Sequence, residues 1–378
     1  MTRPEKLLCD LIALPSVNPA FLPANDAHAG EGRVCEFLAA RAAQAGLDVE
    51  LKTVLPNRAN LLARLSPPGK PRQRLLLVPH LDTVGGDPLS ERLFLPRRRN
   101  GRIHGRGACD TKGSVAAMWA ALAEVARSRQ RPKHTEIIFA ALVDEESGQA
   151  GSRALVAGRL RANLAIVGEP TRLQVVTAHK GDLWLQLETT GKAAHGARPD
   201  LGRNAVHAMS KIVHLLETKY ARALRRRRHP VLGHPTINVG SISGGRQPNI
   251  VPDRCVITVD RRTLPGETDA GVKRELKGFL REHHLAAHLS DFKLVPCHPL
   301  ATPWRTPLVQ QFLRIAGQTR AVGVDYFSDA GVLGHGGIPS VVFGPGDIAQ
   351  AHTPDEWIRT DQLERATRLL VRFLQSLP

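Results

Sequence analysis

The segment LLLVPHLD, residues 75–82, constrains the fold of this chain more than any other stretch. Its uninterrupted apolar run is typical of a strand that is buried on both faces of a parallel or mixed sheet. The run ends in His80 and Asp82, and α/β proteins carry their chemistry at the carboxyl ends of such strands. The side chains of these two residues point the same way in extended chain, so Asp82 can accept the second ring N–H of a metal-binding His80. Read alone, His80 is equally well explained as a structural histidine.

Polar residues follow the other predicted buried strands in the same way. The run Thr135–Val143 is followed by Asp144, Glu145 and Glu146, and the run Leu164–Val167 is followed by Glu169. Asp110 lies in the glycine-framed segment GRGACDTKG, and His352 lies in AHTPDE after the last predicted strand. Each has a structural alternative, for example a helix cap for Asp110 or a turn contact for His352. Together, two imidazoles and three carboxylates at the strand ends of one sheet suit a pair of zinc or cobalt ions. The candidate ligands are His80, Asp110, Glu146, Glu169 and His352.

The pattern of elements changes near Thr171, which predicts a second domain inserted into the first. Residues 173–296 have a β-α-β-β-α-β order, including a long helix over Asn204–Leu224, and this order predicts a ferredoxin-like fold. We expect paired strands around Lys180 and Gly181, and a surface loop over Leu89–Arg102. Residues 1–172 and 297–378 then form the two halves of an α/β catalytic domain.

Composition and charge limit the compartment and the partners expected of this protein. No apolar run is long enough for a signal peptide or a membrane span. The five scattered cysteines match neither a zinc motif nor a disulfide framework. We therefore expect a cytoplasmic protein with no membrane partner. The net charge of +17 falls partly in the runs Arg97–Arg99 and Arg225–Arg228. These could attract nucleic acid. Because interleaved aromatic residues are missing, we expect a solvated basic surface and no nucleic-acid partner.

Six motifs, in order, resemble those of the co-catalytic zinc amidohydrolase family, which includes acetylornithine deacetylase, succinyl-diaminopimelate desuccinylase, aminoacylase and glutamate carboxypeptidase. The motifs are PHLDTV, GRGACDTKG, DEESG, VGEPT, GKAAHGARPDLGRNA and GPGDIAQAHTPDE, and the match spans nearly the whole chain. The resemblance implies a zinc-peptidase-like catalytic domain with a mixed sheet flanked by helices. It also implies an inserted α+β lid domain through which the family forms homodimers, and two Zn²⁺ or Co²⁺ ions per chain.

The resemblance also implies a role for each metal-site residue. His80 and Glu169 would bind one ion, Glu146 and His352 would bind the other, and Asp110 would bridge the two. Asp82 would orient His80, and Glu145 would be the general base. The adjacent glutamates are expected to have different roles because neighbouring residues on a strand face opposite sides.

Residues of the insert complete the implied site. The family histidine matched by His195 reaches the partner subunit's active site and stabilises the oxyanion. Asn249 and Arg262 match positions that bind the substrate carboxylate, and a planar guanidinium suits that contact. Arg262 is preferred to its neighbour Arg261 because RTLPG aligns there. Cys109, beside Asp110, is expected to serve packing alone.

The sequence therefore predicts a metal-dependent hydrolase that cleaves the amide bond of an N-acyl amino acid. The segments GPGDIAQAH and PDEW most resemble the acetylornithine deacetylase branch, which would place the enzyme in arginine biosynthesis. Desuccinylase, aminoacylase and carboxypeptidase or dipeptidase activities share the same catalytic residues and remain alternatives. A basic nucleic-acid-binding protein on the same fold is the alternative from another class, and the complete ligand set argues against it.

Overall fold

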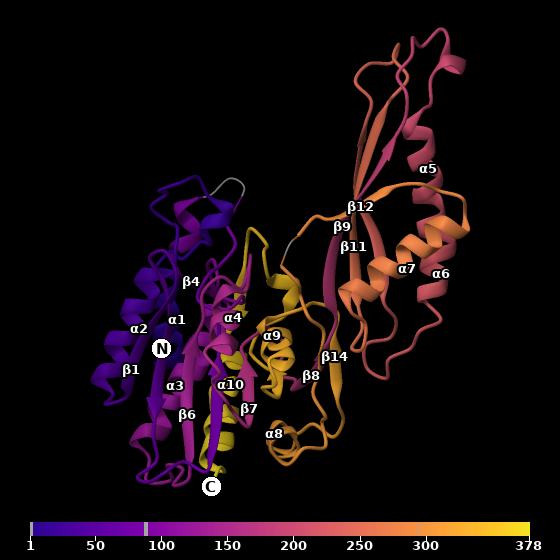
Figure 1. The fold of residues 1–378 in the computed structure, drawn as a ribbon. Coiled ribbons are helices and arrows are strands. Elements are labelled where there is room, and N and C mark those ends of the chain that lie inside the picture. The colour runs from indigo at the N-terminus through magenta and orange to yellow at the C-terminus, as the bar shows by residue number, and fades with distance from the viewer. Residues whose placement is uncertain (1–2, 87–89, 294) are drawn as a thin grey trace. The chain divides into compact units, whose positions relative to one another are not determined.

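The computed structural model describes residues 3–86, 90–293 and 295–378, which form two compact units. The first unit comprises Met1–Ala178, Ala301–Val322 and Ser328–Pro378, and the second comprises His179–Leu300 and Gly323–Phe327. Figure 1 shows the first unit in indigo, magenta and yellow, and the second mainly in orange and pink. Each unit has its own hydrophobic core.

A mixed sheet of nine strands, counted over the described residues, organises the first unit. The strands in spatial order are β1 (Asp48–Leu55), β2 (Arg58–Leu65), β6 (Thr135–Ala141), β3 (Gln73–Val78), β7 (Leu164–Val167), β15 (Ser340–Val342), β8 (Val176–His179) and β13 (Leu300–Ala301), with β14 (Val322–Val324) paired to β8. Strands β6, β3, β7 and β15 are parallel to one another. All seven residues of β6 are buried, as expected of a strand covered on both faces.

Helices cover both faces of this sheet. The main hydrophobic cluster joins the sheet to α1 (Arg3–Ile12), α2 (Gly32–Gln44), α3 (Lys112–Arg127), α8 (Pro307–Ala316) and α10 (Thr360–Gln375). Helix α3 packs against α1 and α10 within it. The buried side chains of α4 (Ala150–Ala157) and α9 (Asp329–His335) lie outside that cluster; these two helices pack together, and α9 contacts β7 and β15. The mixed sheet flanked by helices is the predicted fold class.

The second unit has the predicted β-α-β-β-α-β order. Its elements are β9 (Gly181–Thr190), α5 (Ala205–Leu215), α6 (Ala221–Leu224), β10 (Thr236–Gly244), β11 (Arg254–Thr263), α7 (Asp269–Glu282) and β12 (His288–Asp291). The strands form an antiparallel sheet in the order β10-β11-β9-β12. Helix residues such as Met209 and Leu276 pack with strand residues such as Ile257 in its core.

Two local predictions were wrong. The strands on either side of Lys180 do not pair: β8 joins the large sheet, whereas β9 lies in the sheet of the second unit. The described part of the predicted loop before residue 102 contains a 3₁₀ turn, Glu91–Phe94, and the strand β4 (Arg97–Arg99). This strand pairs through the Asn100-Gly101 turn with β5 (Arg102–His104), and β5 pairs with β16 (Trp357–Arg359). The long helix predicted over residues 204–224 is present from residue 205 to residue 224 and contains a π-helical turn at Leu216–Tyr220. Leu89 lies outside the described residues.

The remaining short elements are 3₁₀ turns at Pro19–Phe21, Pro199–Leu201 and Ile348–Gln350. All five cysteines are free thiols. Within the described ranges, no helix combines the length and apolar character needed to cross a membrane.

Candidate metal centre

The predicted metal ligands lie at the carboxyl-terminal edge of the large sheet. His80 follows β3, Glu146 follows β6 and Glu169 follows β7. These strands are parallel neighbours in the order β6-β3-β7, so their ends meet at one edge. Asp110 lies in the loop before α3, and His352 lies in the loop after β15.

The five residues form two groups that share one carboxylate. One group is His80, Asp110 and Glu169, and the other is Asp110, Glu146 and His352; the ligand atoms within each lie within 4.8 Å of one another. Oδ1 of Asp110 lies 3.2 Å from Nε2 of His80, and Oδ2 of Asp110 lies 3.3 Å from Nε2 of His352. The two oxygens of Asp110 therefore face different groups, an arrangement that would let its carboxylate contact a cation in each group.

The electrostatics of this cluster favour added positive charge. Burial raises the pKa of Glu146 to about 7 and that of Glu169 well above its usual range. Hydrogen bonds with Asp110 and Glu146 raise the pKa of His352 to about 10. The raised pKa values of these carboxyl and imidazole groups reflect crowded acidic side chains, and a divalent cation would take the place of the protons that such groups attract.

The residues fit a pair of divalent metal ions. Oε1 of Glu169 is buried with no hydrogen-bond partner among the described residues, and it lies 3.9 Å from Nε2 of His80. Such an orphaned carboxylate oxygen is costly unless it binds a cation. Imidazole nitrogens and carboxylate oxygens are ligands that zinc and cobalt accept.

Asp82 contacts residues from both groups of candidate metal ligands. It is fully buried, and its two carboxylate oxygens accept the backbone N–H groups of Glu145 at 3.1 Å and Glu146 at 3.0 Å. Its carboxylate also lies 3.4 Å from Nδ1 of His80, whose nearer neighbour, at 3.0 Å, is the backbone oxygen of Asp82. A side-chain amide proton of Asn18 completes the set at 2.7 Å. Asp82 therefore contacts one imidazole and the segment that carries both glutamates.

The two glutamates follow a turn and not an extended strand. Asp144 has a φ of 71°, in the left-handed region, and its carboxylate lies 3.1 Å from the Arg58 guanidinium. After the turn, Glu146 joins the second ligand group, whereas Glu145 belongs to neither group. Burial raises the pKa of Glu145 well above its usual range. This turn, and not the alternation of an extended strand, separates the two side chains.

Glu356 supports the loop that carries Asp110, and the sequence analysis gave it no role. Its buried carboxylate accepts the backbone N–H groups of Gly107, Cys109 and Asp110 at 2.9, 2.8 and 2.9 Å. The guanidinium of Arg106 donates to it at 2.9 Å. Glu356 lies in the PDEW segment, four residues after the candidate ligand His352. A carboxylate at this spacing is the sequence feature that could have indicated its role. The thiol of Cys109 points to the backbone oxygen of Asp347 at 3.3 Å, in keeping with packing.

The predicted substrate residues lie in the second unit. The segments around His195 and Asn249 are bridged, and the Gly196 N–H donates to the Asn249 carbonyl at 2.7 Å. The Ala197 N–H donates to Nδ1 of His195 at 3.1 Å, which leaves the proton of a neutral ring on Nε2. The side chains of His195 and Asn249 are exposed. The ring can therefore donate one hydrogen bond outward.

The two adjacent arginines of β11 differ in their surroundings. Arg261 is buried and donates to Glu267 at 2.6 Å, so its guanidinium is engaged inside the unit. Arg262 is partly exposed and forms a fork with Asp260 at 2.9 Å through two nitrogens. Of the two guanidinium groups, that of Arg262 is the more exposed, and it forms an ion pair with Asp260.

Comparisons with known proteins find relatives that match most of the chain. Residues 76–376 match the family described as Peptidase family M20/M25/M40. An acetylornithine deacetylase of Myxococcus xanthus is 33% identical over 347 residues, which covers 89% of this chain and 90% of that protein. The structure of an M20 family metallo-carboxypeptidase from Sulfolobus solfataricus covers 99% of both chains with a TM-score of 0.77 and 20% identity. A Bacillus subtilis protein described as a dinuclear metal-binding peptidase of the M20 family covers 99% of this chain with a TM-score of 0.69 and 13% identity.

Proposed function

The chain belongs to peptidase family M20/M25/M40, a family of metal-dependent hydrolases, and from this premise we propose that it removes the acyl group of an N-acyl amino acid, with N-acetylornithine as the preferred substrate. The observation that carries the hydrolytic part is the pair of ligand groups that share Asp110. The substrate rests on relatives such as the Myxococcus xanthus protein, which is named acetylornithine deacetylase.

The metal part of the site would hold two Zn²⁺ or Co²⁺ ions. His80 and Glu169 would hold one ion, Glu146 and His352 the other, and Asp110 both. When bound, such ions lower the pKa of a water molecule and polarise the substrate carbonyl. Three carboxylates offset most of the charge of two dications.

Glu145 would serve as the general base. Its buried carboxyl group lies beside the ligand groups without joining either. Its raised pKa suits a group that takes a proton from the attacking water and gives it to the leaving amine. Asp82 would fix the positions of Glu145 and His80 through the contacts described above.

Residues of the second unit would recognise the substrate. The guanidinium of Arg262 and the amide of Asn249 would bind the free α-carboxylate of the amino acid. The exposed Nε2–H of His195 would donate to the oxyanion that forms at the acyl carbon. In the family pattern this histidine acts across a homodimer, so we propose that the second unit mediates a homodimer and that His195 acts in the partner's site. Self-complementary pairing of this kind suits C₂ symmetry.

Turnover on a panel of N-acyl amino acids tests the substrate. The panel comprises N-acetylornithine, N-succinyl-diaminopimelate, other N-acetyl amino acids and dipeptides, each assayed with added Zn²⁺ or Co²⁺. We expect N-acetylornithine to have the highest kcat/KM. A clear preference for the succinyl substrate would refute the deacetylase assignment and leave the hydrolytic mechanism standing. Hydrolysis of no amide in the panel would remove the proposed function.

A further inference from the structure

The edge of the large sheet opposite the metal centre carries a band of cationic side chains. Strands β6, β3 and β7 begin at this edge, directly after His134, Arg72 and Asn163, and they end at the metal centre. A strand of six residues spans roughly 20 Å. Anything bound at this edge is therefore a ligand separate from the substrate.

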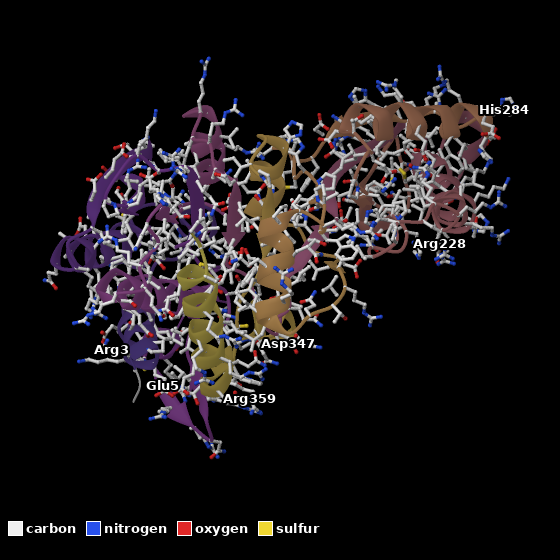
Figure 2. The ribbon with its side chains drawn as sticks, turned by 90° about the horizontal axis from the view of Figure 1, so that it is seen from below. Arg3, Glu5, Arg228, His284, Asp347 and Arg359 are labelled. Atoms are coloured by element: carbon white, nitrogen blue, oxygen red, sulfur yellow. The ribbon has the colours of Figure 1, made fainter. Side chains whose placement is uncertain are left out.

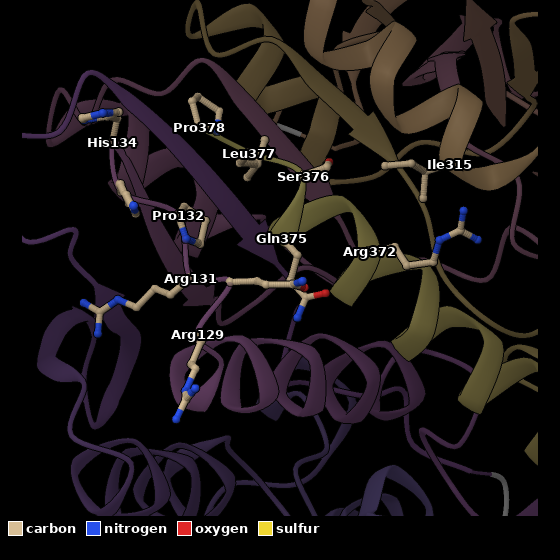
Figure 3. Close-up of a pocket in the computed structure, with 12 residues that line it drawn as sticks. Arg129, Arg131, Pro132, His134, Ile315, Arg372, Gln375, Ser376, Leu377 and Pro378 are labelled. Atoms are coloured by element: carbon tan, nitrogen blue, oxygen red, sulfur yellow. The ribbon is translucent and has the colours of Figure 1, made fainter.

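The basic edge is hollowed. Its largest depression, of about 790 Å³, lies between the loop 129–134, which follows α3, and the carboxyl end of α10, with Ile315 of α8 at its side. Figure 3 shows side chains from the loop and from α10 around this hollow. A second depression of about 720 Å³ shares Lys133 and His134 with the first. A third, of about 260 Å³, continues the band through Arg72.

The charged side chains among the described residues that line these depressions are all cationic. The largest depression is lined by Arg129, Arg131, Lys133 and Arg372, and its two neighbours add four more lysine or arginine side chains. Among the described residues that line the three depressions, none is an aspartate or glutamate. A concave surface of one sign raises the local concentration of ions of the opposite sign.

Several of these cations are not neutralised by the protein. Arg74 pairs with Glu136, and Arg131 donates to the carbonyl of Ser66. Arg129, Lys133 and Arg372 are exposed, and within the described part of the chain no acidic side chain forms an ion pair with them. Their side chains are free to turn toward a bound anion.

The shape and chemistry of the hollow indicate the class of ligand. Its volume falls in the range of small-molecule sites, and Ile315, Leu377 and Pro132 give it an apolar part. Arginine forks bind phosphate groups through two hydrogen bonds. Among the described residues, histidine is the only aromatic type that lines the depressions, so stacking of single-stranded bases is not provided for. We propose that the depression around Arg129, Lys133 and Arg372 binds a small anion that carries two or more phosphate groups.

Calorimetric titration of the metal-loaded protein with inorganic triphosphate tests this proposal. The site variant is R129Q/K133Q/R372Q. The matched control is R225Q/R226Q/R228Q, which removes three exposed charges from the second unit, where Arg228 extends from the surface (Figure 2). Both variants lower the net charge equally, and any loss of metal to triphosphate affects all three proteins alike. Unchanged melting temperature and amide hydrolysis confirm that each variant is folded.

We expect the control to bind triphosphate like the parent protein and the site variant to bind at least about fivefold more weakly, because three charged contacts are lost. Binding should also weaken as NaCl is raised. Equal affinities for all three proteins, or no binding heat with the parent, would overturn the proposal. Tighter binding of a 20-nucleotide RNA, weakened by the same variant, would also overturn it by assigning the surface to a nucleic acid.

Discussion

The metal centre of the first unit and the substrate residues of the second unit are built in opposite ways. Four of the five metal ligands are at least nine-tenths buried in side-chain terms, and Asp82 and Glu356 hold their loops with three and four hydrogen bonds. His195 and Asn249 are exposed, and the hydrogen bonds described for their segments are mainly between backbone atoms.

Because of this difference, we expect the two units to support different parts of the proposed chemistry. The buried carboxylates of the first unit are fixed before any ligand arrives, as metal sites with strong outer support are. The second unit presents hydrogen-bond donors at its surface, and these donors require an acceptor from a ligand or a partner. We therefore expect changes in the first unit to alter metal binding and proton transfer, and changes in the second to alter turnover without altering metal content.

The largest effect is expected for Glu145→Gln, which keeps the shape of the side chain but cannot take a proton. It should lower kcat by about 10²–10⁴-fold and leave the metal content intact. Glu146→Gln is the matched variant and should lose metal. Steady-state kinetics with elemental analysis of both proteins measure this. The reverse pattern would show that the two roles are exchanged.

His195→Ala should lower kcat by about 10²–10³-fold, because one donor to the oxyanion is lost, with no change in metal content. Mixing this variant with Glu145→Gln provides a sharper test. A heterodimer would contain one intact site if His195 acts in the partner's site. Recovered activity on mixing is the expected result. No recovery despite demonstrated subunit exchange would place His195 within its own chain's site or outside catalysis.

A smaller effect is expected for Glu356→Gln. Its carboxylate accepts three backbone N–H groups around Asp110, and loss of such outer support typically costs about 10–100-fold in metal affinity. Asp355→Asn is the control, because its side chain is 91% exposed. Competition with a metal chelator gives both affinities. Equal affinities for the two variants would contradict the supporting role of Glu356.

The sequence was most informative where burial is continuous. The unbroken apolar runs that became β3, β6 and β7 predicted buried strands, and the polar residues after them predicted the edge where the ligands meet. The periodic spacing of apolar residues and the order of the segments also predicted the elements of the second unit. Its strands and helices have one polar and one apolar face, which produces that spacing.

Other features depend on contacts between residues that are distant in sequence. Glu356 accepts hydrogen bonds from Gly107, Cys109 and Asp110, which precede it by between 246 and 249 positions in the chain. No local sequence pattern predicts these bonds. The turn at Asp144 is stabilised by Arg58, which lies on a different strand. Strands β8 and β9 are neighbours in sequence, yet they join different sheets, and a short apolar run does not specify its pairing partner.

Counting bound metal ions against activity asks whether the two groups that share Asp110 bind two ions that hydrolysis requires. Metal-depleted protein should hydrolyse no amide, and activity should return with Zn²⁺ or Co²⁺ until two ions are bound per chain. Asp110→Asn should bind neither ion tightly. Full hydrolysis by protein shown to be metal-free, or two tightly bound ions in Asp110→Asn, would contradict the account.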